Sequence, residues 1–241
     1  FGGKFLNAIG AISVVPSPAL TPISVVISDT INNQNGNGYW QPGETLNLFP
    51  QPVFKYKIDN FKEYNKKLSE YIYNLNREDK EGVQRSNKGG WHSKSFKFND
   101  TNSIQHKFFL ETTKYVFDAI QTYGWILEPD KVICSEMWAI INKKDNFNIR
   151  HTHPNCNLSA AYYVKAPKKC GDIIFYDPRP GKVYKHPLSN NINLLNAITN
   201  GIKPETGMLV LFPSYLEHSV DPNVSDNERI VISFNISLEK K

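Results

Sequence analysis

The pattern of apolar and polar positions changes near residue 50. Residues 1–50 carry only three charged side chains, Lys4, Asp29 and Glu44, and are rich in Ser, Pro, Asn and Gly. The stretch 33–44 (NQNGNGYWQPGE) consists of residues that favour turns, and it lacks the regularly spaced acids of a calcium loop. We therefore predict an N-terminal extension or linker over residues 1–47 and a main domain over residues 48–241.

Two helices are predicted near the start of the main domain. Residues 53–58 alternate as a strand does, and Asn60 is placed to cap a helix that runs to about residue 76. A second helix is predicted over about 103–123. Apolar residues recur at helical spacing in both; in the first helix they are Phe61, Tyr64, Leu68, Tyr71 and Leu75.

Strand patterns dominate after residue 130. Short β-rich runs alternate with clusters of Pro, Gly and Asn, which is typical of a sandwich or barrel rather than of βαβ units. The predicted fold class is therefore mainly β with flanking helices (α+β). The runs are 132–141, 148–153, 158–164, 172–176, 207–212 and 229–238.

Composition adds little about partners. The net charge is +5, from 28 Lys+Arg and 23 Asp+Glu, and the lysines are scattered, so we predict a solvated surface rather than nucleic-acid binding. Three cysteines without a CxxC pair favour a reducing, cytoplasmic setting.

No apolar run is long enough to span a membrane. Oligomeric state is not readable from the sequence.

The N-terminus gives two weaker indications. The first residue is Phe rather than Met, which favours a fragment or a processed product. Lys4 followed by the apolar run 5–12 faintly resembles a secretion signal, although Asn7 and the prolines at 16 and 18 weaken the match.

Three histidines form a candidate metal site. His151 and His153 lie at a predicted strand end, where residues i and i+2 share a face about 6–7 Å apart. His218 follows the apolar run 207–212, and a jelly roll brings such distant strands together. Three neutral ligands leave coordination positions open, as redox iron chemistry requires, although zinc also accepts three histidines.

A candidate anion site follows the third histidine. Residues 229, 231, 233 and 235 share one face of the last predicted strand. If that face is on the same side as His218, Arg229 offers a fixed two-pronged donor to a carboxylate, and Ser233 adds a hydroxyl. Tyr163 can add a phenol from another strand. Such a set suits a dicarboxylate that chelates the metal at its other end.

These residues occur in stretches that resemble a known family. The stretches are 90–93 (GWHS), 151–164 (HTHPNCNLSAAYYV), 171–180 (GDIIFYDPRP), 207–220 (GMLVLFPSYLEHSV) and 228–236 (ERIVISFNI). The segment 148–238 resembles the iron(II)/2-oxoglutarate-dependent oxygenases, with an order of motifs similar to that of prolyl-hydroxylase-like enzymes. From about residue 48 the chain resembles a subgroup of uncharacterised oxygenases from marine bacteria and their phages.

The resemblance implies a double-stranded β-helix (jelly roll, cupin-like) with iron(II) and 2-oxoglutarate as cofactors. It implies that His151 is the proximal ligand, His218 the distal ligand and Arg229 the 2-oxoglutarate anchor, and that Tyr163 helps to hold the far carboxylate. The implied reaction is hydroxylation coupled to decarboxylation of 2-oxoglutarate to succinate. The substrate, a small molecule or a protein side chain, is not specified.

One position departs from the usual pattern of this family. The common triad is His-x-Asp/Glu…His, whereas here His153 stands where the carboxylate is expected. The motif His-x-His-Pro is similar to the pattern of the subgroup. A third histidine makes the site more cationic than the usual triad; without His153 only two protein ligands would remain.

Five further residues are predicted to line the substrate pocket. Trp138, Asn142 and Asn235 are expected to face the barrel interior, in packing or in substrate contact. His92 is either a structural histidine or part of the pocket mouth. Arg179, in the turn 177–180, either extends over the pocket or belongs only to a rigid turn.

Two other classes of function remain open. A cupin-type metal enzyme without 2-oxoglutarate fits the His-x-His pair, but the glutamate expected soon afterwards is replaced by Asn157, Leu158 and Ser159. A non-catalytic jelly-roll binding module also fits the fold. Binding of 2-oxoglutarate distinguishes the oxygenase from both.

Overall fold

The computed structural model describes residues 12–15, 24–27, 49–126, 131–179 and 189–238. The chain divides into two compact units, residues 1–50 and residues 51–241. In the first unit β1 (Ile12–Val15) pairs with β2 (Ser24–Ile27) in an antiparallel hairpin. The predicted signal-like run and the turn-rich stretch 33–44 lie largely or wholly outside the described residues. The division at residues 47 and 48 stays a prediction about domain organisation.

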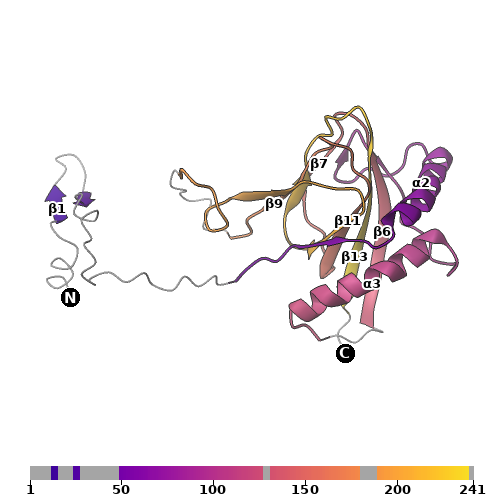
Figure 1. Ribbon diagram of the computed structural model, residues 1–241, viewed down its shortest axis with the longest axis horizontal. Helices are drawn as coiled ribbons and strands as arrows, with labels where there is room; N and C mark the ends of the chain where they lie inside the picture. The colour runs from indigo at the N-terminus through magenta and orange to yellow at the C-terminus, as the bar shows by residue number, and fades with distance from the viewer. Residues whose placement is uncertain (1–11, 16–23, 28–48, 127–130, 180–188, 239–241) are drawn as a thin grey trace. The chain divides into compact units, whose positions relative to one another are not determined.

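The second unit contains a large antiparallel sheet with two helices beside it (Figure 1). The helices are α2 (Phe61–Glu78) and α3 (Ile104–Thr122), close to the predicted bounds. The order of the six strands is β3–β11–β8–β13–β6–β5. Their bounds are β3 (Phe54–Lys57), β5 (Trp91–His92), β6 (Val132–Asn142), β8 (Leu158–Lys165), β11 (Met208–Pro213) and β13 (Arg229–Leu238).

A second, five-stranded sheet is also antiparallel, in the order β10–β9–β12–β7–β4. Two antiparallel sheets with helices on the outside confirm the predicted mainly β fold of the jelly-roll type. The strands are β4 (Asn87–Lys88), β7 (Phe147–His151), β9 (Ile173–Tyr176), β10 (Thr199–Ile202) and β12 (His218–Val220).

The alternation of side chains along β13 separates two apolar clusters. Ile230, Ile232 and Phe234 are fully buried on the helix side of the large sheet, in one core with residues of α2 and α3. Burying each such side chain contributes about 1.5–3 kcal/mol. The opposite face of β13, beginning with Arg229 and Val231, is turned toward the cavity described below. The period-2 pattern therefore fixes which residues reach the site.

Polar contacts within the core fix α2 on the sheet. The Asn65 side chain of α2 donates to the carbonyl of Val164 (2.7 Å) and accepts from the hydroxyl of Tyr162 (2.5 Å). Phe108 of α3 packs against the same Tyr162 ring at 4.6 Å between centroids. The helices thus hold β8 from outside, while the next residue of that strand, Tyr163, faces the cavity.

The strand that carries the first histidine is shorter than predicted. β7 ends at His151, so His153 lies in the segment after the strand rather than on its face. The His153 amide donates instead to the Ser214 carbonyl, at 2.9 Å. Pro154 follows and has no N–H to continue a ladder. The expectation that both histidines lie on one strand is therefore wrong, although both reach the same site.

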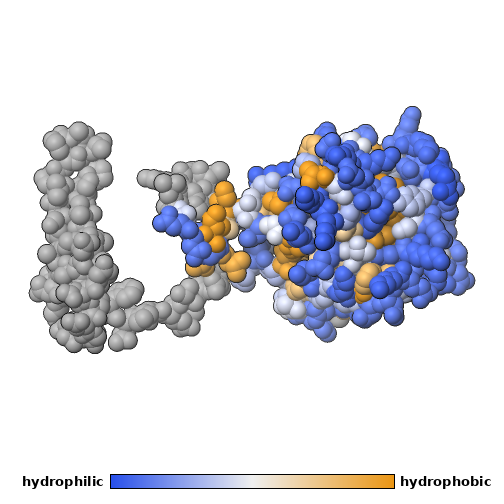
Figure 2. All heavy atoms as spheres, turned by 45° about the horizontal axis from the view of Figure 1, so that its top comes forward, coloured by the Kyte–Doolittle hydropathy of each residue, from blue (hydrophilic) through white to orange (hydrophobic). Residues whose placement is uncertain are grey.

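Figure 2 shows a mostly hydrophilic surface over the described part of the second unit, with scattered apolar residues. Four of the exposed apolar side chains lie close together in the sequence: Ile192, Leu194, Leu195 and Ile198. Among the described helices, neither is long and apolar enough to cross a membrane.

Candidate metal and cosubstrate site

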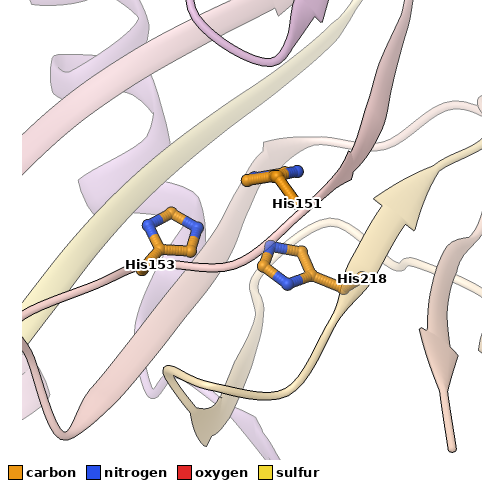
Figure 3. A group of neighbouring side chains, drawn as sticks. All are labelled: His151, His153 and His218. Carbon is orange, nitrogen blue, oxygen red and sulfur yellow. The ribbon is translucent and has the colours of Figure 1, made fainter. Parts of the chain in front are cut away.

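Three imidazoles converge between the two sheets (Figure 3). Each of His151, His153 and His218 offers one ligand atom, and these atoms lie within 4.8 Å of one another. Ring centroids are 4.3 Å apart for His151 and His218, and 5.1 Å for each pair that includes His153. Cross-strand pairing of His218 with His151 brings the distant segments together. The predicted grouping of three histidines is therefore present.

Backbone contacts fix the orientation of two of these rings. The Nδ1 atom of His151 lies 2.7 Å from the Ile149 carbonyl, and that of His218 lies 3.0 Å from the Leu216 carbonyl. A carbonyl can only accept, so in both rings Nδ1 carries the proton and Nε2 keeps its lone pair for a metal.

Burial keeps the three imidazoles neutral. Desolvation, followed by the charge of the neighbouring His151, lowers the pKa of His153 to about 4 and that of His218 to about 3. Desolvation also lowers the pKa of His151. Metal binding requires the deprotonated ring, so the three donors are ready at neutral pH.

The imidazoles open into a cavity of about 500 Å³. Such a volume is in the range of small-molecule sites. Most residues predicted from the sequence line it. They are Trp138, Asn142, Tyr163, Arg229, Ser233, Asn235 and His92, together with the three histidines.

Arg229 is a buried cation in this cavity. Its side chain is 1% exposed, and its Nη1 atom donates to the carbonyls of Cys170, Gly171 (3.3 Å) and Asp221 (3.4 Å). Its Nη2 atom is buried and has no hydrogen-bond partner among the described residues. The guanidinium also interacts with the Cys170 side chain and, through its charge, with Asp221, but its free Nη2 can still donate to an anion in the cavity.

Tyr163 and Ser233 line the same cavity as this guanidinium, from the adjacent strands β8 and β13. Tyr163 pairs with Val231, and Ser233 pairs with Ala161, on the adjacent strands β8 and β13. Burial raises the pKa of the Tyr163 phenol, so that it stays protonated and able to donate. Tyr163, Ser233 and Arg229 therefore supply hydroxyl and guanidinium donors along one wall, as a carboxylate requires.

Aromatic stacking builds another part of the wall. The Trp138 ring stacks on His92 at 5.5 Å and on His153 at 5.7 Å, with interplanar angles of 10° and 20°. His92 is 8% exposed and its Nδ1 lies 2.7 Å from the Ser93 carbonyl. Thus His92, for which sequence left a structural role and a pocket role open, lines the cavity as part of a three-ring column.

The two predicted pocket asparagines have different surroundings. Asn142 pairs across the sheet with Arg229, donates to the Asn148 side chain (3.1 Å), and its Oδ1 has no partner among the described residues. Asn235 accepts at Oδ1 from the Ser159 hydroxyl (2.9 Å), which also lies 2.9 Å from the Ser214 hydroxyl. Asn235 is thus held by its neighbours, whereas Asn142 keeps a free acceptor.

Arg179 is not among the described residues that line the cavity, and its role as a pocket residue stays a prediction. The guanidinium folds back onto Asp177 in its own turn, with Nη2 2.6 Å and Nε 3.0 Å from Oδ2. This contact within residues 177–179 is what the alternative of a rigid turn predicts.

Sequence reasoning missed three charged residues of the cavity, Arg85, Lys94 and Glu136. Glu136 was detectable, because it precedes Trp138 by two positions on β6 and therefore shares its face. Arg85 had no signal, since it lies in a loop before the two-residue strand β4, which the sequence pattern does not indicate.

Residues 136–235 match the family described as "Putative 2OG-Fe(II) oxygenase". The match spans the three histidines, Tyr163 and Arg229. It confirms the predicted resemblance and, at the level of the family, the predicted enzyme class with iron(II) and 2-oxoglutarate as cofactors. The narrower subgroup of marine bacteria and phages stays a prediction. No curated protein matches the sequence significantly.

Solved structures support the fold. A Pseudomonas putida prolyl-4-hydroxylase has a TM-score of 0.56 at 13% identity, covering 79% of this chain and 94% of its own. A Trichoplax adhaerens prolyl hydroxylase, in complex with a hypoxia inducible factor peptide, has 0.53 at 13%, covering 86% of both chains. HygX of Streptomyces hygroscopicus, with nickel, 2-oxoglutarate and hygromycin B bound, has 0.55 at 10%, covering 78% and 83%.

Proposed function

We propose that this protein is an iron(II)- and 2-oxoglutarate-dependent oxygenase whose metal is held by His151, His153 and His218. In this proposal Arg229, Tyr163 and Ser233 hold the far carboxylate of 2-oxoglutarate. The observation that carries it is the buried Arg229, which lines the same cavity as the histidines and whose Nη2 atom has no hydrogen-bond partner among the described residues. A dicarboxylate with one end on the metal supplies an anionic acceptor for this free donor.

The residues fit iron(II) by their chemistry. Imidazole is a common ligand for iron, and a three-sided donor set leaves positions open. Since all three donors are neutral, the charge of the metal is not reduced by a protein carboxylate. The negative charge of 2-oxoglutarate would instead compensate the charge of the metal, so this donor set favours binding of the two together. Bound iron(II) with 2-oxoglutarate supplies the oxidising power that couples decarboxylation to substrate oxidation.

The chain itself contributes binding, orientation and exclusion of water. Backbone carbonyls orient His151 and His218, and stacking on Trp138 orients His153. The apolar cluster of Ala161, Val231 and Phe212 lies beside the predicted cosubstrate donors and keeps water away from them.

Substrate class and setting belong to the same proposal. The similar structures include enzymes shown with a peptide and with a small molecule, and we infer that this protein oxidises a substrate of one of these two kinds. We place it in a reducing, cytoplasmic setting, which is consistent with three free cysteines.

The test is anaerobic titration with iron(II) and 2-oxoglutarate, followed by the charge-transfer absorption of the ternary complex. We expect a band in the parent protein and none in His218→Ala. We expect Arg229→Ala to weaken 2-oxoglutarate affinity at least tenfold, because a charge-assisted hydrogen bond contributes about 1.5–3 kcal/mol.

Arg179→Ala is the matched control, since it removes an arginine that is not among the described residues lining the cavity. Arg229→Lys guards against misfolding, because it retains the buried charge but not the two-pronged geometry. A parent protein without a band at millimolar 2-oxoglutarate would contradict the proposal and favour a cosubstrate-independent cupin or a binding module.

A further inference from the structure

The charged side chains of the cavity leave one cation and one anion without partners. Four charged residues line it: Arg85, Lys94, Glu136 and Arg229. Lys94 pairs with Asp79 at 2.9 Å, and Arg229 is assigned to 2-oxoglutarate. Among the described residues, neither Arg85 nor the Glu136 carboxylate forms an ion pair with a protein group. Glu136 is the only carboxylate in the described lining.

These two charges come from opposite walls. Glu136 lies on β6 of the six-stranded sheet, on the cavity face with Trp138. Arg85 precedes β4 at the edge of the five-stranded sheet, and its backbone is fixed by an N–H bond to the Asn87 side chain (2.8 Å). Both side chains are exposed at the cavity and line it together with His92. Burial lowers the pKa of His92, the Ser93 carbonyl raises it, and the charges of Arg85 and Glu136 have smaller, opposite effects on the same ring.

A buried donor lies beside this pair. Trp138 is 7% exposed, and its Nε1 atom is buried and has no partner among the described residues. By contrast, the Trp91 indole donates to the Asp79 carbonyl at 2.7 Å. Buried N–H groups are almost always hydrogen-bonded, so a cavity donor of this kind indicates an acceptor on a bound molecule.

We propose that the primary substrate is a free amino acid, whose ammonium binds Glu136, whose carboxylate binds Arg85, and whose polar atoms accept from Trp138 Nε1. This inference rests on the proposed function and narrows its substrate class. A zwitterion satisfies both unpaired charges with no net charge of its own. A residue inside a peptide chain has neither terminal charge and leaves both unpaired.

The test uses NMR spectroscopy to follow the indole N–H resonances. The protein is loaded with 2-oxoglutarate and with zinc(II), a diamagnetic substitute for iron(II). The chain has four tryptophans, and Trp138→Phe identifies the resonance of Trp138. The common L-amino acids are added singly at millimolar concentration. We expect at least one to shift the Trp138 resonance saturably while that of Trp91 stays in place.

Charge variants then assign the two ends of the ligand. Glu136→Gln and Arg85→Gln should each weaken binding of that amino acid about fivefold, as expected for partly exposed ion pairs. Lys94→Gln is the control and should have no effect. The carboxamide of the amino acid should bind weakly, and its affinity should not change in Arg85→Gln. The affinity of the N-acetyl amino acid should not change in Glu136→Gln.

Two results would overturn this inference. One is that no amino acid moves the Trp138 resonance in protein whose iron(II) form shows the 2-oxoglutarate charge-transfer band. The other is that an N-acetyl amino acid amide binds as tightly as the free amino acid, which would point to a peptide. If the band itself is absent, the proposed function fails instead, so the two failures are distinguishable.

Discussion

At the scale of single residues, the three histidines link metal binding to proton binding. In the folded chain the pKa of His153 is lowered to about 4 and that of His218 to about 3, against an ordinary value of 6.5. The unfolded chain therefore binds more protons below pH 6.5 than the folded chain does. The resulting stability is complete above that pH and is lost as the pH falls toward the folded values.

We predict that the metal-free protein loses on the order of a few kcal/mol of unfolding free energy between about pH 6.5 and about pH 4.5. Urea denaturation at a series of pH values measures it. The double variant His153→Gln and His218→Gln should have a flatter profile in this window. If parent and variant have the same slope, these histidines are not the source of the pH dependence.

At the scale of elements, the loop between β8 and β9 determines how Arg229 is held. Gly171 has φ +88, and its carbonyl accepts from the guanidinium. A Cβ at this position would collide with the Asp221 carbonyl and lie 2.8 Å from Arg229 Nη1. The glycine therefore allows close approach as well as the left-handed backbone.

We predict that Gly171→Ala weakens 2-oxoglutarate affinity about tenfold or more, because it displaces the anchor, and that it also lowers thermal stability. Gly124→Ala is the matched control: its φ is +66, but nothing lies within 4 Å of the added Cβ. That variant should lose about 1 kcal/mol of stability and keep its cosubstrate affinity. Equal affinities in the two variants would show that Gly171 does not position Arg229. Calorimetric titration with 2-oxoglutarate supplies the measurement.

Helices and strands were predictable from the sequence where one face of the element is buried along its whole length. The alternation in β13 correctly placed Arg229 and Ser233 on one face, and the apolar spacing of α2 and α3 gave their bounds within a few residues. Strands β4, β5, β10 and β12 were not predicted. β4, β5 and β12 have only two or three residues, and β10 has Thr, Asn and Gly at its first three positions, so none of them has an alternating apolar pattern. Pairing with the partner strand, rather than local preference, determines these strands.

At the scale of the whole molecule, closure of the jelly roll was not derivable from spacing. The pairing of His218 with His151 depends on β12, a strand too short to predict, so the meeting of the histidines rested on family resemblance. Likewise, the sequence did not decide between the two alternatives for Arg179. In the structure its guanidinium contacts Asp177, two residues earlier, an acceptor that spacing alone does not rank against a position above the cavity.

The domain organisation supports a last prediction. The two buried apolar clusters and the cavity are built from described residues after residue 50. Gln51 accepts from the Tyr215 hydroxyl (2.6 Å), and the Pro52 carbonyl accepts from that of Tyr123 (3.4 Å), so these residues belong to the domain. We predict that a chain starting at Phe49 retains the melting temperature and the 2-oxoglutarate affinity of the full chain. A chain starting at Phe54 should be less stable, because it lacks these two contacts and also Val53, which packs against the apolar cluster beside the cavity. Thermal unfolding and cosubstrate titration of the three chains provide the comparison. A marked loss of affinity in the chain that starts at Phe49 would assign residues 1–48 a part in the site and contradict the predicted boundary.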